Sequence, residues 1–250
     1  MPDSSTTPCA RVFLLSPANC GGPRAQQILS PTAQFALAAQ LRSRRGAMLG
    51  DVFAFISGLY FRGKLVYSMR FAAPPEVDNP IIGCGVHVIT PNAGLRAPDT
   101  YVTLKALCAF AQGDVHQANA KYRRPLEKSA RALAREIGSD CDVVLLGSVA
   151  SPKYVDALTA IFGDRLLFPI DFVGRGDMSR GGLLLRKARE GVELPYVPVR
   201  GAVLHGARPP RLPPLGRLEP GKAGWQDGSQ PGWSETSKAG WQHRSKAETS

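Results

Sequence analysis

The sequence lacks the features that mark several protein classes. Its five cysteines are odd in number and include no C-x-x-C pair, so neither a disulfide framework nor a zinc site is expected. No window reaches the roughly 18 uninterrupted apolar residues of a membrane helix. The N-terminal residues lack the basic and apolar regions of a signal peptide, so the expectation is a cytoplasmic protein with reduced, mostly buried thiols, including Cys108 and Cys141.

Motifs of the common enzyme classes are also missing. The chain contains no H-E-x-x-H, no Walker loop, no G-x-G-x-x-G fingerprint and no G-x-S-x-G elbow. Of its four histidines, His87 falls inside an expected strand, where a packed side chain is the usual finding. We therefore expect no resident metal and no cofactor. An acid–base mechanism would have to rest on aspartates.

Positive charge is in excess. The chain has 31 Lys and Arg against 20 Asp and Glu, a formal net charge of +11. From Ala207 onward there are seven basic and four acidic residues, so the preceding part alone carries +8. This balance favours a polyanionic partner, nucleic acid or nucleotide, without separating DNA from RNA. A basic proteome is the plain alternative, and the oligomeric state is not indicated.

The composition divides the chain into three parts. Residues 1–10 are polar and predicted to be disordered. Residues 11–206 have the composition of one α/β domain. Residues 207–250 are rich in proline and repeat Lys-Ala-Gly-Trp-Gln at 222–226 and 238–242, so we predict a low-complexity, disordered tail.

Four apolar runs alternate with amphipathic segments in the central part. The runs are predicted as strands and lie at 11–15, 85–89, 142–146 and 166–170. Helices are expected from Ser30-Pro31 to near Arg42 and at 59–71, 100–110, 124–137, 152–162 and 183–190. A last strand at 194–199 contains two prolines and suits a sheet edge. The pattern predicts an α/β fold with three layers, a mostly parallel central sheet flanked by helices.

The helix at 59–71 is dense in aromatic residues. Its apolar spacing is that of a core helix. The alternative is that Tyr60, Arg62 and Lys64 contact a nucleic-acid strand by stacking and charge pairing.

All four strands lead into loops rich in glycine, hydroxyl and charged residues. In parallel sheets ligands bind outside the carboxyl ends of the strands, so these loops would form one composite site. The most cationic loop is Phe172–Leu185, which we interpret as an anion-binding turn; an ordinary strand-to-helix turn is the alternative. The candidate phosphate- or nucleic-acid-binding residues are Ser16, Asn19, Arg24, Asn92, Ser148, Lys153, Arg175, Ser179 and Arg180.

The candidate catalytic residues are two aspartates of the same loop, Asp171 and Asp177. In a cationic cleft they would stay ionised. An ionised aspartate can orient a water molecule or stabilise an oxocarbenium-like sugar.

The order of several short segments resembles a known family. Leu15-Ser16-Pro17-Ala18, then Gly94–Asp99, then Ser151–Tyr154, then Arg175–Arg186 resemble the YaaA-type peroxide-stress proteins. The segment Ile89–Leu95 also resembles the uracil-DNA-glycosylase-like domain of archaeal tRNA-guanine transglycosylase relatives. The resemblance implies an α/β fold associated with nucleic acid and base-excision-like chemistry.

These observations give one leading hypothesis and two alternatives. The leading one is a nucleic-acid- or nucleotide-directed α/β protein with a glycosylase-like site acting on a base–sugar bond. The first alternative is a non-catalytic nucleic-acid-binding module with a stress or DNA-protection role. The second is an enzyme that binds a small-molecule nucleotide.

Overall fold

The computed structural model describes residues 9–150, 152–202, 206–210 and 212. The chain divides into two units, Met1–Leu212 and Pro213–Ser250, and the second lies wholly outside the described residues. Residues 1–8 of the predicted disordered N-terminus and most of the predicted tail also fall outside them, so disorder there stays a prediction. Ala10 is ordered, because its carbonyl accepts from the Asp142 backbone N–H at 2.8 Å.

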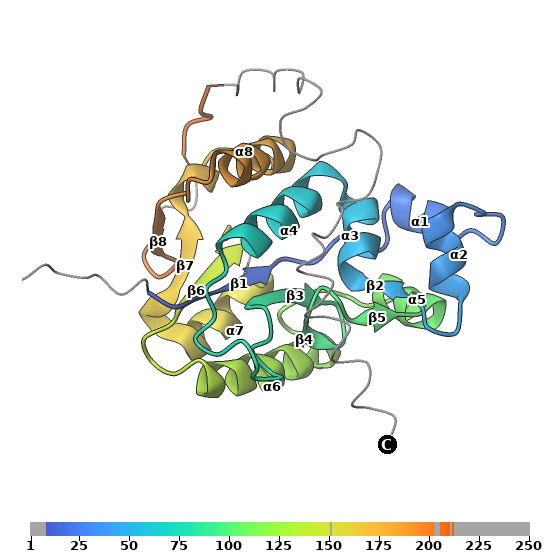
Figure 1. Ribbon diagram of the computed structural model, residues 1–250, viewed down its shortest axis with the longest axis horizontal. Helices are drawn as coiled ribbons and strands as arrows, with labels where there is room; N and C mark the ends of the chain where they lie inside the picture. Colours follow the sequence, from blue (N-terminus) through green and yellow to red (C-terminus); the bar gives the residue numbers. More distant parts are fainter. Residues whose placement is uncertain (1–8, 151, 203–205, 211, 213–250) are drawn as a thin grey trace, which may run out of the picture. The chain divides into compact units, whose positions relative to one another are not determined.

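A six-stranded sheet forms the centre of the first unit, with strand order β4-β3-β1-β6-β7-β8 (Figure 1). Its four inner strands are parallel: β3 (Val86–Thr90), β1 (Arg11–Leu15), β6 (Asp142–Leu146) and β7 (Leu166–Pro169). The two edge strands, β4 (Gly94–Arg96) and β8 (Tyr196–Pro198), run antiparallel to their neighbours. The predicted mostly parallel sheet is therefore confirmed, including an edge position for the proline-containing last strand.

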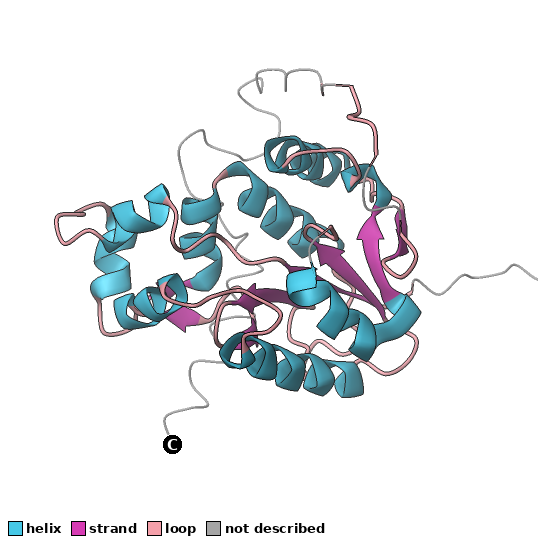
Figure 2. Cartoon of the chain, turned by 180° about the vertical axis from the view of Figure 1, so that it is seen from behind, coloured by secondary structure: helices cyan, strands magenta, loops and turns pink. Residues whose placement is uncertain are grey.

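Helices cover both faces of this sheet, as Figure 1 and the reverse view in Figure 2 show. Alternate residues of β1 point to opposite faces: Phe13 and Leu15 belong to one apolar cluster, Val12 and Leu14 to the other. The first cluster is completed by α1 (Pro23–Leu29), α2 (Ala36–Arg42), α3 (Leu49–Ser57), α4 (Leu59–Phe71), α5 (Leu104–Ala111) and α8 (Asp177–Glu190). The second contains α6 (Ala120–Glu136) and α7 (Pro152–Phe162). This is the predicted three-layer arrangement.

A small second sheet was not predicted. It pairs β2 (Ala47–Met48) with β5 (Tyr101–Val102) in antiparallel fashion. The two strands have two residues each, too short for an alternating pattern to show in the sequence. The helix expected from residue 100 consequently begins only at Leu104, where the Thr103 side chain caps it.

The expected helix start at Ser30-Pro31 is wrong. Ser30 is the C-terminal cap of α1, and the Ser30 backbone N–H donates to the Gln26 carbonyl oxygen. The helix itself begins at Pro23. Pro31 follows a helix end, where it cannot continue the helix. Arg42, at the end of α2, donates to the Ser30 carbonyl at 2.5 Å, so it holds the α1–α2 connection rather than lying free in a solvated turn.

The beginning of α8 is also corrected. The helix starts at Asp177, six residues before the predicted Leu183. Gly181 and Gly182 make this part of the sequence look unlike a helix, because glycine disfavours a helix interior by about 1 kcal/mol. Asp177, Ser179 and Arg180 therefore belong to the first turn of a helix and not to a loop.

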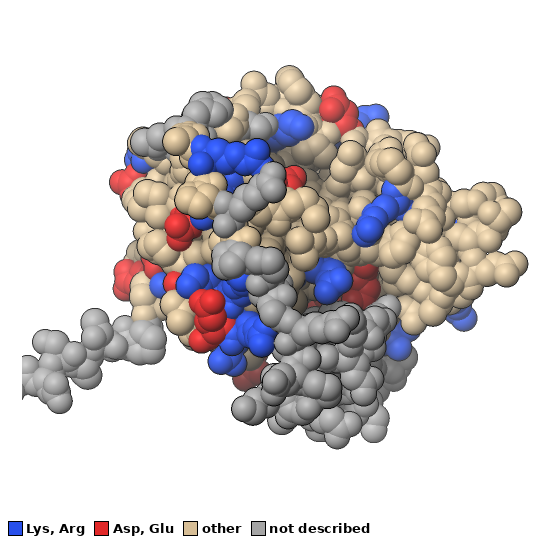
Figure 3. Space-filling view, turned by 90° about the horizontal axis from the view of Figure 1, so that it is seen from above, with Lys and Arg blue, Asp and Glu red and all other residues tan. Residues whose placement is uncertain are grey.

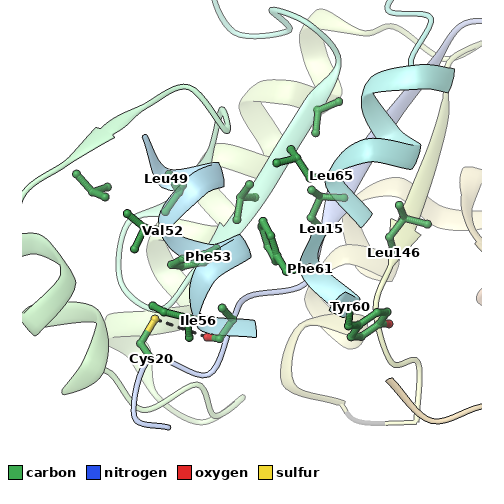
Figure 4. Close-up of a cluster of buried hydrophobic side chains, with 14 of the residues drawn as sticks. Leu15, Cys20, Leu49, Val52, Phe53, Ile56, Tyr60, Phe61, Leu65 and Leu146 are labelled. Atoms are coloured by element: carbon green, nitrogen blue, oxygen red, sulfur yellow. Dashed lines mark hydrogen bonds between the residues drawn. The ribbon is translucent and has the colours of Figure 1, made fainter. Parts of the chain in front are cut away.

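The core on the α4 side packs aromatic side chains between helices. Phe53 of α3 and Phe61 of α4 meet edge to face, with ring centroids 5.4 Å apart (Figure 4). Both side chains are fully buried. Buried aromatic pairs of this geometry contribute about 1 kcal/mol beyond their area. This packing fixes α4, and α4 supplies the side chains described next.

None of the described helices is long and apolar enough to cross a membrane. None of the five cysteines, all of which lie within the described residues, forms a disulfide. Cys20 and Cys141 are buried, but Cys9 and Cys108 are exposed and Cys84 is partly buried, so the expectation of mostly buried thiols is wrong, and Cys108 is the specific exception among the thiols expected to be buried.

Candidate functional site

The carboxyl ends of β3, β1, β6 and β7 lie on one edge of the sheet because the four strands are parallel. Three of the four following loops contribute to one group of side chains. These loops contain Ser16 after β1, Gly147 and Ser148 after β6, and residues 171–180 after β7. The fourth loop, after β3, is hydrogen-bonded through its Asn92 side chain to α5.

Ser16 and Lys64 form the centre of the group. The Lys64 ammonium donates to the Ser16 carbonyl oxygen at 2.8 Å and to the Ser16 hydroxyl at 2.9 Å. Lys64 lies on the inner face of α4 and is only 1% exposed, while Ser16 is 7% exposed. The two residues lie 48 positions apart in the chain and meet because α4 packs over the end of β1.

The surroundings of the Lys64 side chain are mostly apolar. Its Nζ atom lies 4.5 Å from the ring centre of Tyr60 and 4.9 Å from that of Phe61. Within the described residues no carboxylate approaches it to ion-pair distance. Burial lowers the pKa of Lys64 to about 7; the more distant Asp177 carboxylate opposes this shift and Arg180 adds to it. The amine is therefore partly neutral near pH 7.

Tyr154 of α7 reaches the same point from the other layer. Its hydroxyl donates to the Ser148 carbonyl at 3.0 Å. Burial raises the pKa of Tyr154, and a hydrogen bond with the Ser16 hydroxyl counteracts the rise. A Cβ atom on Gly147 would lie 2.7 Å from the Tyr154 hydroxyl and 3.1 Å from the Ser16 hydroxyl. Only glycine fits there, because both hydroxyls occupy the space beside its Cα.

Tyr60, on the first turn of α4, adds a second phenol. Its hydroxyl is buried and makes no hydrogen bond of good geometry with the described residues. Burial raises the pKa of Tyr60, and the nearby Arg180 guanidinium lowers it. Tyr60 and Lys64 are therefore parts of a buried polar cluster, and the alternative that they stack on a nucleic-acid strand is wrong for both.

Two glycines bring the N-terminal turn of α8 next to this cluster. A Cβ atom on Gly63 of α4 would lie 2.7 Å from the Gly181 carbonyl oxygen. A Cβ atom on Gly181 of α8 would lie 2.8 Å from the Leu59 carbonyl oxygen and from Tyr60 Cα. The helix backbones are thus in direct contact. Their first turns lie at the same edge of the sheet, where both helix dipoles are positive.

Two predicted cations are held at this helix start by backbone carbonyls. Arg175 donates to the carbonyl of Asp171 at 3.0 Å and to the Ser179 hydroxyl at 3.2 Å. Arg180 donates to the carbonyl of Phe172 through two nitrogens, at 3.2 and 3.0 Å. Arg180 lies close enough to lower the pKa of Lys64 and of Tyr154. No described contact joins Arg175 or Ser179 to Ser16 or Ser148, so the predicted grouping of these residues in one site stays a prediction.

The two predicted catalytic aspartates take different positions. Asp171 lies in a single 3-10 turn, Ile170–Phe172, directly after β7, and is half-buried. Asp177 is the first residue of α8, and its side chain is 71% exposed. Its carboxylate lies 3.7 Å from Arg180, at the limit of an ion pair. It stands at the rim of the cluster, and its field reaches Lys64 and Tyr60.

The remaining predicted residues make other contacts. Asn92 donates to the Ala109 carbonyl of α5 at 3.0 Å and so connects its loop to that helix. Arg24 donates to the Phe55 carbonyl at 3.2 Å, where α3 gives way to α4. The Asn19 side chain accepts from Gly21 N within its own turn. Lys153 is exposed on the first turn of α7. None of these four shares a hydrogen bond with the Ser16 cluster among the described contacts.

Sequence reasoning gave Lys64 only the alternative role of a contact to a nucleic-acid strand, and it assigned no site role to Tyr154 or Gly147. A signal for Lys64 was present. It follows Tyr60 by four residues and Phe61 by three, and residues at those spacings share one helix face. A lysine on an apolar helix face is buried, and a buried lysine has a perturbed pKa. No comparable signal marks Tyr154, because its partners come from other strands.

Comparison with known proteins identifies no relative. No family model matches the chain, and neither a curated protein nor a solved structure matches it significantly.

Proposed function

We propose that this protein binds the phosphate groups of a nucleic acid or nucleotide at the carboxyl edge of β1, β6 and β7. The observation that carries the proposal is the pair Arg175 and Arg180, whose guanidinium groups are held by backbone carbonyls; the nearest carboxylate to Arg180, that of Asp177, lies 3.7 Å away at the exposed rim. Anchored this way, each keeps its positive charge available to an anion.

The helix start next to these arginines supports the same ligand. The N-terminal cap residue of α8, Gly176, makes no side-chain hydrogen bond to the first turn. Unpaired N–H groups and the positive dipole end at such a position favour phosphate. The arginines and the helix start together are more specific than either alone.

The overall charge favours a polyanion. Basic residues exceed acidic ones by 11, and basic side chains are spread over the face of the molecule shown in Figure 3. Counterion release from a nucleic acid would then contribute to affinity. This class of function is also what the resemblance to YaaA-type proteins implies. We place it in the cytoplasm, where the five cysteines, which form no disulfide, would stay reduced.

Glycosylase-like chemistry at Asp171 or Asp177 stays a prediction from the sequence. Asp177 has the more suitable position, since its carboxylate is accessible at the rim. The prediction is checked by base release from DNA in an Asp171→Asn/Asp177→Asn double variant, which would lose the activity. The small-molecule nucleotide enzyme and the non-catalytic binding module also stay predictions.

Binding is tested by fluorescence anisotropy with labelled single-stranded DNA, double-stranded DNA and RNA over a salt series. Arg175→Gln and Arg180→Gln should each weaken binding about tenfold at low salt and reduce the slope of log K against log salt by about one. The matched control is Arg131→Gln, because Arg131 is exposed on α6 in the opposite layer. Equal losses in all three variants, or binding that does not respond to salt, would contradict the proposal.

A further inference from the structure

The amine of Lys64 has no structural partner that explains its charge. Lysines are almost never fully buried unless they are paired, and partly buried ones extend their ammonium to water. Here the side chain is 1% exposed, and the contacts of Nζ within the described part of the chain are with Ser16 and two aromatic rings. An uncharged side chain of similar length, ending in a methyl group or an amide, would fill the same space with a smaller desolvation cost. The arrangement is instead typical of an amine kept partly neutral next to a hydroxyl.

The Ser16 hydroxyl is held from two sides. Lys64 Nζ lies 2.9 Å away on the α4 side. The Tyr154 hydroxyl lies beside it on the α7 side, since both hydroxyls would crowd a Cβ atom on Gly147, and Tyr154 is itself fixed by the Ser148 carbonyl. A nucleophile within hydrogen-bond reach of a base, oriented by a third group, is the general arrangement for nucleophilic catalysis.

Of these groups, the serine hydroxyl and not the amine is placed to meet a substrate. Ser16 keeps 7% of its surface exposed against 1% for Lys64. Gly147, whose Cα faces both hydroxyls, also lines a small hollow together with Phe172 and Arg180. Its volume of about 10 Å³ is that of one water molecule or one phosphoryl oxygen.

The positive charges at the rim of the hollow indicate which electrophile the serine would attack. Arg180 lines this hollow, and Arg175 is held in the segment directly before α8. Guanidinium groups and a helix start stabilise negative charge that develops on phosphoryl oxygens. We propose that Ser16 is the nucleophile of a phosphoryl-transfer centre, with Lys64 as the base that accepts its proton and Tyr154 as a positioning residue. The substrate class, a phosphate ester of a nucleotide or nucleic acid, rests on the proposed function.

The step balances without a further reactant. The Ser16 Oγ–P bond forms, and the bond from phosphorus to the leaving oxygen breaks with its electron pair. The hydroxyl proton passes to Lys64 Nζ, and the resulting ammonium returns it to the leaving oxygen, which departs as an alcohol. In a second step a water molecule attacks the phosphorus, the Oγ–P bond breaks, the phosphate leaves carrying the water oxygen, and a proton from the water regenerates the Ser16 hydroxyl.

The test uses an alkyl fluorophosphonate carrying biotin, which reports serine reactivity without any nucleic acid. The full-length protein should be labelled at Ser16, as located by peptide mass spectrometry. Ser16→Ala should remove the label, and Lys64→Met should slow labelling at least 100-fold. Tyr154→Phe should slow it about tenfold. Ser139→Ala, which removes an exposed hydroxyl away from the cluster, should label at the wild-type rate.

The pH dependence of wild-type labelling gives a second readout that needs no variant. The rate should rise through a single ionisation near pH 7, because the neutral amine is the base. The groups that face Lys64 are Tyr60 of α4, Ser16 after β1, and Asp177 and Arg180 of α8. Asp177→Asn should shift this ionisation to lower pH, since Asp177 opposes the lowered pKa.

Absence of label at Ser16 in the folded wild-type protein would overturn the inference, as would a Lys64→Met variant that labels at the wild-type rate. If Lys64→Met does not fold, a flat pH profile of the wild-type protein would overturn it as well. Failure of the proposed function is separable. Wild-type protein that is labelled at Ser16 but binds no nucleic acid would contradict the proposed function alone, because the labelling reaction needs no nucleic acid, whereas wild-type protein that binds nucleic acid but is not labelled would overturn this inference alone.

Discussion

Replacing Gly181 by alanine is expected to destabilise the protein by about 3 kcal/mol. The added Cβ atom would lie 2.8 Å from the Leu59 carbonyl oxygen and from Tyr60 Cα. Backbone atoms cannot move aside as a side chain can, so α8 would have to separate from α4. Separation would also loosen Leu183 and Leu184, which are buried in the core on this side.

The neighbouring glycine provides a matched control. Gly182 lies in the same helix, and the nearest atom to an added Cβ there is a Leu212 methyl carbon at 3.9 Å. Alanine at this position makes ordinary contact and gains helix propensity, so Gly182→Ala should be neutral or stabilise by up to about 1 kcal/mol. Urea unfolding of both variants measures the difference. Similar free energies of unfolding for the two variants would show that the helices are not in backbone contact.

The same contact positions the site. Arg180 directly precedes Gly181, and its guanidinium group influences Lys64 and Tyr60. Gly63→Ala, which introduces the clash from the α4 side at 2.7 Å, should therefore act like Gly181→Ala. Both variants should weaken nucleic-acid binding more than Gly182→Ala does.

The stability of the protein should depend on the charge of Lys64. Burial lowers its pKa from 10.5 to about 7 in the folded chain. Between these two values the unfolded chain binds a proton that the folded chain does not, so stability rises with pH. Relative to Lys64→Met, the wild-type free energy of unfolding should rise by about 2 kcal/mol from pH 7 to pH 9. Below about pH 6 the difference should be constant.

The difference in free energy of unfolding between the wild type and Lys64→Met isolates the contribution of the Lys64 amine. Other groups with shifted pKa values, such as buried His87 with its pKa lowered to about 4, are present in both proteins and cancel. Lys121→Met is the control, because Lys121 is exposed on α6. Its difference from wild type should stay flat over the same range. A flat profile for Lys64→Met would mean that the buried amine stays charged.

The parallel strands were predictable because each is a short, fully apolar run bounded by turn residues. Asp142–Leu146 and Arg11–Leu15 are found where the sequence places them. Helix α4 was predicted with its observed bounds, since its apolar spacing continues to Phe71. Proline at the first position likewise marked the start of α7.

Other elements could not be read from local patterns. The first turns of α8 contain Gly181 and Gly182, whose low helix propensity is overridden by packing against α4. Ser30-Pro31 fits both a helix start and a helix end, and only the tertiary contact of Arg42 with the Ser30 carbonyl separates the two.

Only the site residues that directly follow strand ends were predictable from the sequence. Ser16, Ser148 and Arg175–Arg180 follow strand ends, and the rule for parallel sheets places them on one edge. Lys64 and Tyr154 come from helices in opposite layers. Their meeting at Ser16 depends on how α4 and α7 pack on the sheet, which no local spacing encodes.

The central claim is that a phosphate-bearing ligand binds at the edge formed by Ser16, Gly147 and the first turn of α8. Amide NMR spectra recorded during titration with a single-stranded DNA pentamer test it most directly. The largest shift changes should fall on Ser16, Gly147, Ser148 and residues 175–180, and they should disappear in Arg175→Gln/Arg180→Gln. Changes confined to α1, α2 and α5 or to the outer face of α6, or none at ligand concentrations that bind in the anisotropy assay, would contradict the claim.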